Sequence, residues 1–139
     1  MTVSQAIVTW LYTNTTISVD ETVDTDMLAA NAAALGLYKT PQTNVITYTN
    51  GTRDVTAYYT FHVRQRSNVE VTRQTNQAWL EAFETWVRSQ SRARVLPTLT
   101  APLYCEDVFI ANTFSAQEQE TDETIYQLTL GINYIDKAA

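Results

Sequence analysis

A stripe of large apolar side chains recurs at helical spacing between residues 76 and 90. Trp79, Leu80, Phe83, Trp86 and Val87 fall on one helical face, and polar residues take the other side. We therefore predict an amphipathic helix over about 73–91. Aromatic side chains bury about 150–250 Å² each when they are covered, so this helix needs an apolar sheet to lie on. We expect Trp86 to be buried between the helix and that sheet.

A second, shorter helical face lies near the N-terminus. Val3, Ala6, Ile7, Trp10 and Leu11 share it, and Thr2 or Ser4 is available as the N-cap. We predict a helix over about 3–13. A helix of this length is marginal alone in water, so its apolar stripe must dock on the rest of the domain.

The next segment has weaker patterns. Residues 17–19 have the composition of a brief strand, and the acidic, Thr-rich residues 20–26 are typical of a loop. The Ala-rich residues 27–34 favour one or two turns of helix, which Gly36 would end as the residue just past the C-cap.

Several later segments have strand patterns. A short strand over 37–39 is limited by Pro41, since proline cannot donate to a ladder, and residues 45–49 predict another strand. Asn50-Gly51 is a strong hairpin signal, and residues 55–66 then alternate between apolar and polar positions.

Two more strands follow the central helix. Residues 103–115 have apolar residues on both faces, and an acidic turn is predicted at 117–123. After this turn, residues 126–134 alternate cleanly between apolar and polar side chains. The order predicts one α+β domain over residues 1–139. It has an antiparallel or mixed sheet of four to five strands, with both helices packed on it.

Composition narrows the function classes. Charged residues make up 17% of the 139 residues, and the formal net charge is −6, which argues against non-specific nucleic-acid binding. No run of about twenty apolar residues would span a membrane. The N-terminus lacks the basic and apolar regions of a signal peptide, so we expect synthesis in a cytoplasm.

Few residues suggest chemistry. His62 is the sole histidine and Cys105 the sole cysteine, so a zinc site of the usual kind lacks ligands, and a nucleophile–base pair would need these two together. No phosphate-binding glycine motif occurs, and the acidic residues lack the pattern of a calcium loop. We therefore expect no catalytic residue, cofactor or metal. Four arginines would favour a protein interface over a nucleic-acid patch: Arg53, Arg64, Arg66 and Arg73.

Several segments together resemble a known family. They are TPQTNVITYTNGTRDVTAYYTFHVRQR, NQAWLEAFETWV, VLPTL and VFIANTFSAQEQETDETIYQLTLGINYI. Their order and spacing resemble the siphophage tail terminator, or minor capsid, family over roughly residues 37–135. Residues 20–36 look longer than in the family pattern.

The resemblance implies a protomer of a ring, commonly six-fold, in the virion. That ring would cap the major tail tube protein, meet a neck or head completion (stopper) protein, and let DNA pass through its lumen. No catalysis or cofactor is implied. Repeated in every subunit, the acidic turn would either steer docking to a basic partner or line the lumen. We expect interface roles for Asn50, Gly51, Arg53, Arg64, Arg66, Glu118, Glu120 and Asp122.

Other functions stay open on the sequence. In the same structural class, the chain would be another neck or tail-tube component. From a different class, it would be a small-ligand or peptide-binding α+β domain. A small hydrolase that uses Cys105 and His62 is the last alternative.

Overall fold

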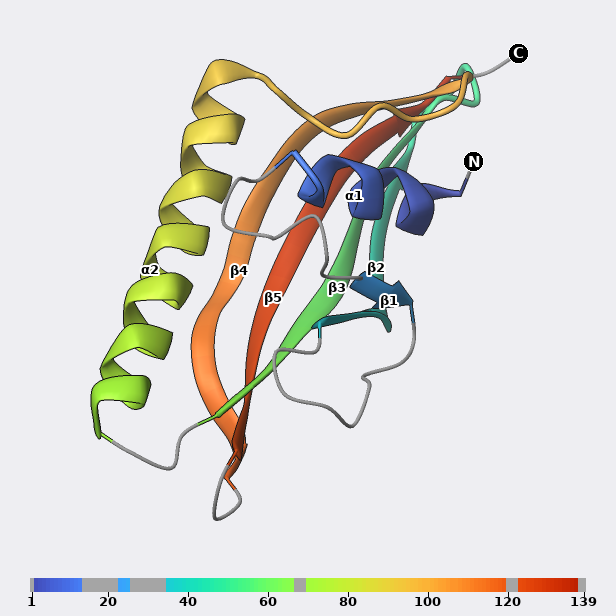
Figure 1. Cartoon of the computed structure of the whole chain (residues 1–139). Coiled ribbons are helices and arrows are strands. Elements are labelled where there is room, and N and C mark those ends of the chain that lie inside the picture. Colours follow the sequence, from blue (N-terminus) through green and yellow to red (C-terminus); the bar gives the residue numbers. More distant parts are fainter. Residues whose placement is uncertain (1, 14–22, 26–34, 67–69, 120–122, 138–139) are drawn as a thin grey trace.

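The computed structural model describes residues 2–13, 23–25, 35–66, 70–119 and 123–137. Two helices lie against a five-stranded sheet in the order β1-β2-β3-β5-β4 (Figure 1). The strand β1 (Val23–Thr25) pairs with β2 in parallel, and the other neighbours are antiparallel. The predicted α+β class with a mixed sheet is therefore confirmed. The predicted strand at 17–19 and helix at 27–34 lie outside the described residues.

The helix α1 (Val3–Leu11) begins at a reciprocal cap. The Thr2 hydroxyl accepts the Gln5 backbone N–H at 3.1 Å, and the Gln5 side chain accepts the Thr2 N–H at 2.7 Å. Such a capping box satisfies two backbone donors that the helix itself leaves unpaired. The helix ends two residues before the predicted Thr13. Its buried side chains are Ala6, Ile7, Trp10 and Leu11.

The strands β2 (Leu35–Thr47) and β3 (Arg53–Arg66) form the hairpin that Asn50-Gly51 predicts. Two predictions about β2 are wrong. Gly36 lies within the strand and does not end a helix, and Pro41 does not divide β2 but sits in a register shift between Lys39 and Thr43. Within the described sheet, β1 pairs with β2 only at 35–37, so residue 41 lies on an edge, where a proline is tolerated because no backbone N–H is needed there. Strand β1 also replaces part of the loop predicted at 20–26.

The helix α2 (Glu70–Ala93) runs along the sheet beside β4 (Figure 1). Leu80, Phe83 and Val87 are buried, and Phe83 stacks on Phe61 of β3 with ring centroids 4.9 Å apart. The prediction for Trp86 is wrong in its detail. This ring is only partly buried and meets Trp10 of α1 at 4.6 Å, so it closes the junction between the two helices.

A left-handed residue ends α2. Arg94 has φ 60°, its N–H donates to the Ser91 carbonyl at 3.2 Å, and the Val95 N–H donates to the Gln90 carbonyl at 2.9 Å. These two bonds form a Schellman motif, in which glycine is the usual left-handed residue. Asp107 holds this end to the sheet, because it accepts the Ser91 hydroxyl at 2.6 Å and pairs with Arg94 at 3.7 Å.

The strands β4 (Leu103–Gln119) and β5 (Glu123–Asp136) form the long closing hairpin. The acidic turn predicted at 117–123 is wrong in extent, since both strands continue into it and only residues 120–122 lie between them. Strand β4 carries four register shifts. At the shift between Asn112 and Ser115, the Phe114 backbone N–H donates to the Glu84 carboxylate of α2 at 2.8 Å. Glu84 thus replaces the strand partner that Phe114 lacks at this shift.

Both helices cover the same face of the sheet. The core joins Ile7, Trp10 and Leu11 of α1 and Phe83 and Val87 of α2 to alternate residues of the central strands. On β3 and β5 these are Ala57, Tyr59, Phe61, Val63, Leu128, Leu130 and Ile132. The clean alternation predicted for both strands is confirmed. Neither helix of the described chain packs on the residues between them, and we call their side of the sheet the open face.

Candidate interaction surfaces

The structure divides the predicted interface residues between two ends of the sheet. Asn50, Gly51 and Arg53 lie at the β2–β3 turn, which Figure 1 places beside the C-terminus. Arg64, Arg66 and Glu118 lie toward the β4–β5 turn at the opposite end. Strand β3 has 14 residues, so at about 3.3 Å per residue its ends are about 43 Å apart. Glu120 and Asp122 lie outside the described residues.

The β2–β3 turn is closed by local hydrogen bonds. The Gly51 N–H donates to the Tyr48 carbonyl at 2.9 Å, and the Tyr48 N–H donates to the Thr52 carbonyl at 2.8 Å. Gly51 has φ 89°, a value that glycine adopts without strain. The Asn50 side chain accepts the Thr52 N–H at 3.0 Å. Asn50 and Gly51 therefore shape the turn that the sequence predicts.

Arg53 forms an ion pair within the chain. Its guanidinium lies 3.7 Å from the Asp136 carboxylate, and about half of the arginine side chain is exposed, at 48%. Ion pairs this exposed contribute about 0–1 kcal/mol to stability. Arg53 therefore remains accessible to a partner at this end of the sheet.

At the opposite end, charges of both signs come from neighbouring strands. Arg66 of β3 stands directly across from Glu123 of β5, and Glu118 of β4 stands across from Ile125. Arg64, two residues before Arg66 on β3, also stands across from Ile125, so Arg64 and Glu118 lie on opposite sides of this β5 residue. Charged residue types of both signs therefore occupy neighbouring register positions at this end of the sheet.

The open face is polar near the hairpin end and aromatic further along. The Asn133 amide donates to Asp54 at 2.6 Å and to the Thr56 hydroxyl at 3.2 Å. Further along, the Tyr38 ring lies 4.5 Å from the His62 ring, and burial lowers the pKa of His62 below its usual 6.5. A face with few charges is typical of a protein contact surface, whose centre is depleted of charged residues.

The Phe109 ring covers a glycine on the open face. A Cβ added at Gly131 would clash with the Phe109 ring, so a larger residue there would have to displace the ring. The ring also meets Tyr58 edge-on at 6.3 Å. The glycine in β5 thus has a packing role that the sequence pattern alone did not identify.

Cys105 and His62 are not placed to act together. Cys105 packs toward the helix-covered core and pairs across from Tyr134, whereas His62 lies on the open face across from Gln127. Seven residues of β5 separate these positions, or about 23 Å. Burial also raises the pKa of the Cys105 thiol to about 11, which disfavours the nucleophilic thiolate. The geometry therefore gives no support to the hydrolase alternative.

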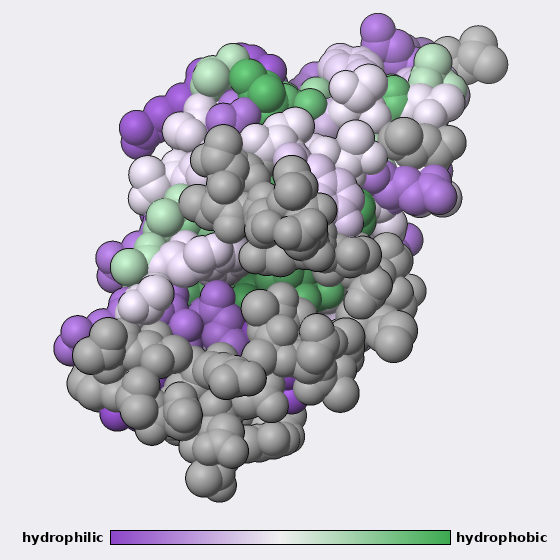
Figure 2. Space-filling model, in the orientation of Figure 1, coloured by the Kyte–Doolittle hydropathy of each residue, from purple (hydrophilic) through white to green (hydrophobic). Residues whose placement is uncertain are grey.

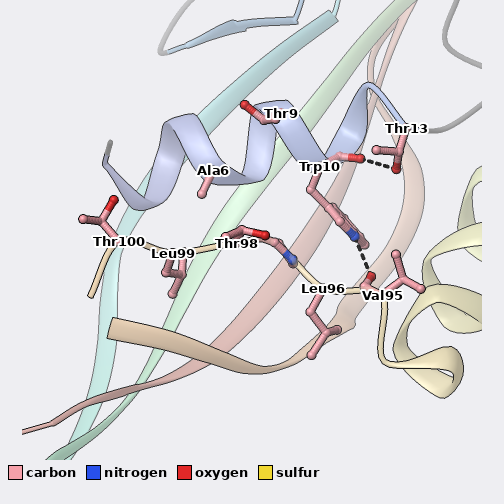
Figure 3. Close-up of a pocket in the computed structure, with 10 residues that line it drawn as sticks. Ala6, Thr9, Trp10, Thr13, Val95, Leu96, Thr98, Leu99 and Thr100 are labelled. Carbon is pink, nitrogen blue, oxygen red and sulfur yellow. Dashed lines mark hydrogen bonds between the residues drawn. The ribbon is translucent and has the colours of Figure 1, made fainter. Parts of the chain in front are cut away.

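The structure also contains a groove that sequence reasoning missed. It lies between α1 and the extended connection after α2, and its volume is about 400 Å³ (Figure 3). The Trp10 indole N–H donates to the Val95 carbonyl at 2.8 Å and holds the two sides together. The groove is lined by Ala6, Thr9, Trp10, Thr13, Val95, Leu96, Pro97, Thr98, Leu99 and Thr100. The signal for it was the apolar run 95–99 around Pro97, which is neither helix nor strand.

The helix side of the surface is unevenly polar. Figure 2 shows hydrophilic atoms along the outer side of α2 and a hydrophobic area beside its C-terminal end. Among the described residues, no group of three or more His, Cys, Asp or Glu side chains is placed to hold a metal ion. Within the same residues, no helix is long and apolar enough to cross a membrane.

Comparison with known proteins adds no relative. No family model matches the chain, and a search of curated proteins found no significant match.

Proposed function

We propose that this chain is a structural subunit of a tailed-phage virion, a tail terminator that assembles into a ring. The ring caps the tail tube, joins it to the neck, and lets DNA pass through its lumen. It carries no cofactor and catalyses no reaction. Its location is the tail or neck of the virion, after synthesis in the host cytoplasm.

The fold supports the resemblance on which this proposal began. The resembling segments form the β2–β3 hairpin, then the amphipathic α2, then the connection through Pro97, then the β4–β5 hairpin. They therefore make one structural unit, in which β5 lies between β3 and β4 and joins the two hairpins into one sheet. This is the compact α+β protomer that the resemblance implies.

One observation carries the proposal: the sheet has two different ends about 43 Å apart and a face that neither helix covers. A subunit that joins a tube to a neck needs separate contact regions for the two partners, as well as a surface for its neighbours. The hairpin end has an uncharged turn shaped by Asn50 and Gly51, next to the exposed ion pair of Arg53 and Asp136. The opposite end carries charges of both signs. Two ends of different chemistry suit two different partners.

The charged end suits a docking role better than a lumen role. Glu118 and Glu123 stand in paired strands, and Arg66 is directly across from Glu123. Charges of both signs in one place favour recognition of a complementary protein surface, which steers docking. A lumen surface that keeps DNA from sticking would be uniformly negative.

A capping assay tests the proposal. The purified chain is added to growing tubes of the tail tube protein encoded beside it, and tube length is measured by electron microscopy. We expect arrested tubes with a ring at one end. The triple variant Glu118→Gln, Glu120→Gln, Asp122→Asn should weaken capping or head joining in a salt-dependent way. If tube lengths and tube ends are the same with and without the added chain, the proposed function is contradicted.

The groove beside α1 is an observation that favours the alternative of a small-ligand or peptide-binding domain. Its volume of about 400 Å³ lies in the range of ligand pockets, about 300–1,000 Å³, as a small-ligand or peptide-binding domain would require. A chain that remains monomeric and is stabilised against heating by added apolar peptides would favour that alternative.

A further inference from the structure

The exposed hydrophobic side chains of the described residues are concentrated in two places. Val45, Ile46 and Tyr48 are exposed at 41%, 59% and 51%, and all three belong to the β2–β3 hairpin. Val95, exposed at 48%, lines the groove beside α1, and the exposed Tyr12 is next in sequence to the lining residue Thr13. Single exposed apolar residues are ordinary, but clusters mark contact sites. Tyr104 is the remaining large hydrophobic residue exposed in the described chain.

The first cluster lies at the edge of the sheet, in a segment that we call the arm and define as residues 43–51: the end of β2, paired with β3, and the turn that follows it. Every residue of the arm is exposed, although Val45 and Ile46 point to opposite faces of the sheet. The opposing strand is different, since Val55 is buried directly across from Val45. Strand β1 ends its pairing at Leu37, so within the described sheet the outer edge of the arm has no neighbouring strand. The arm is therefore an uncharged segment whose three large apolar side chains, Val45, Ile46 and Tyr48, are exposed.

The second cluster borders a preformed groove. Its two sides are already tied by the bond from the Trp10 indole to the Val95 carbonyl, as Figure 3 shows. Binding in a preformed site avoids the ordering cost that a flexible site incurs. The volume of about 400 Å³ is enough for apolar side chains from an inserted segment. In the structure the arm is exposed, so it does not fill the groove of its own chain.

The absence of charge from both surfaces favours a second copy as the occupant of the groove. Each copy carries a formal net charge of −6, so copies repel one another on average. The arm, TNVITYTNG, contains no charged residue, and neither do the ten residues that line the groove. Both surfaces combine apolar side chains with threonine hydroxyls. Two copies can therefore meet through these surfaces without bringing like charges together.

We propose that the arm of one copy docks in the groove of the next copy, with Ile46 and Tyr48 as its apolar anchors. The inference rests on the proposed ring and names the contact that builds it. Arm and groove are different surfaces, so the contact is heterologous, and such contacts generate a closed ring when their rotation closes. Buried tyrosine at the centre of an interface is a frequent source of binding energy.

Two matched variants of the full chain test this contact. Ile46→Glu places a charge on the arm, and Val95→Glu places the same charge on the groove. Thr85→Glu, on the exposed side of α2, is the control. Burying an unpaired carboxylate is costly, so each of the first two variants should weaken self-association by about thirtyfold or more. The control should associate like the wild type in sedimentation velocity, and far-UV circular dichroism should show that all three fold.

Mixing gives the decisive result. An Ile46→Glu copy keeps an intact groove, and a Val95→Glu copy keeps an intact arm, so an equimolar mixture should form 1:1 dimers and nothing larger. If both variants assemble like the wild type, the arm–groove contact is wrong, although the proposed ring is not contradicted. Variants that dissociate but do not form dimers on mixing would also overturn it. A wild-type chain that stays monomeric at all concentrations would contradict the ring and the contact together.

Discussion

The stability of the domain should depend most strongly on Phe83. Its ring is completely buried, lies 4.9 Å from Phe61 in a stacked geometry, and is surrounded by Trp79, Trp86 and Phe114 at 5.7–6.1 Å. Truncating a buried Phe to Ala costs about 3–5 kcal/mol. Since domains of this kind have about 5–15 kcal/mol in total, Phe83→Ala should lose a large share of the free energy of unfolding.

Trp86 and a conservative replacement provide the comparison. Trp86 is partly exposed at the junction of the two helices, so Trp86→Ala should cost less than Phe83→Ala, about 1–3 kcal/mol. Phe83→Leu keeps most of the volume and should cost about 1.5 kcal/mol or less. Guanidinium unfolding, with an unchanged m-value, measures all three. A loss below about 1 kcal/mol for Phe83→Ala, or a larger loss for Trp86→Ala, would refute the packing described here.

Three further outcomes follow from single residues. Burial raises the pKa of Cys105 from 9.0 to about 11, which lowers the fraction of reactive thiolate at pH 8. Iodoacetamide should therefore label the folded chain about a hundredfold more slowly than the unfolded chain at that pH. Equal labelling rates would contradict the burial of Cys105. Burial lowers the pKa of His62, so the unfolded state binds its proton more readily and stability should fall as pH drops through about 6.5. An NMR titration of this sole histidine should give a midpoint below 6.5, and one above it would refute the assignment. Gly131→Ala should cost about 1–3 kcal/mol because its Cβ meets the Phe109 ring, and most of that loss should disappear when Phe109→Ala is combined with it.

Periodicity predicted the elements whose burial is one-sided. The alternation of β3 and β5 and the stripe of α2 each place apolar residues toward one core, so the residues themselves record which face is covered. The Asn-Gly turn was equally readable, because its backbone geometry requires a residue such as Gly51. In these segments local sequence and tertiary contacts agree.

The misjudged positions depend on contacts distant in sequence. Gly36 has the residue type of a helix end, but pairing of β2 with both β1 and β3 makes it a strand residue. The acidic residues near 118 and 123 resemble a turn, but pairing with the distant β3 extends β5 back to Glu123, and β4 then pairs with β5 as far as Gln119. Trp86 lies on the predicted stripe, and only the position of α1 decides that it meets Trp10.

The candidate interface residues were predictable only in part. Asn50 and Gly51 were found because a turn has its own local signal. The groove joins α1 to a connection some 85 residues later through the Trp10–Val95 bond, and no local pattern reports such a pairing. The exposure of Val45 and Ile46 was also hidden, since β-branched residues in a strand pattern suggest burial until the strand is found at an edge.

The mass of the wild-type assembly in solution tests the central claim most directly. Native mass spectrometry of the purified chain, combined with negative-stain images of the same sample, measures the number of copies and their arrangement. The proposed function predicts a single closed species, commonly of six copies, with a central opening. A monomer at high concentration, or a compact dimer without an opening, would contradict it.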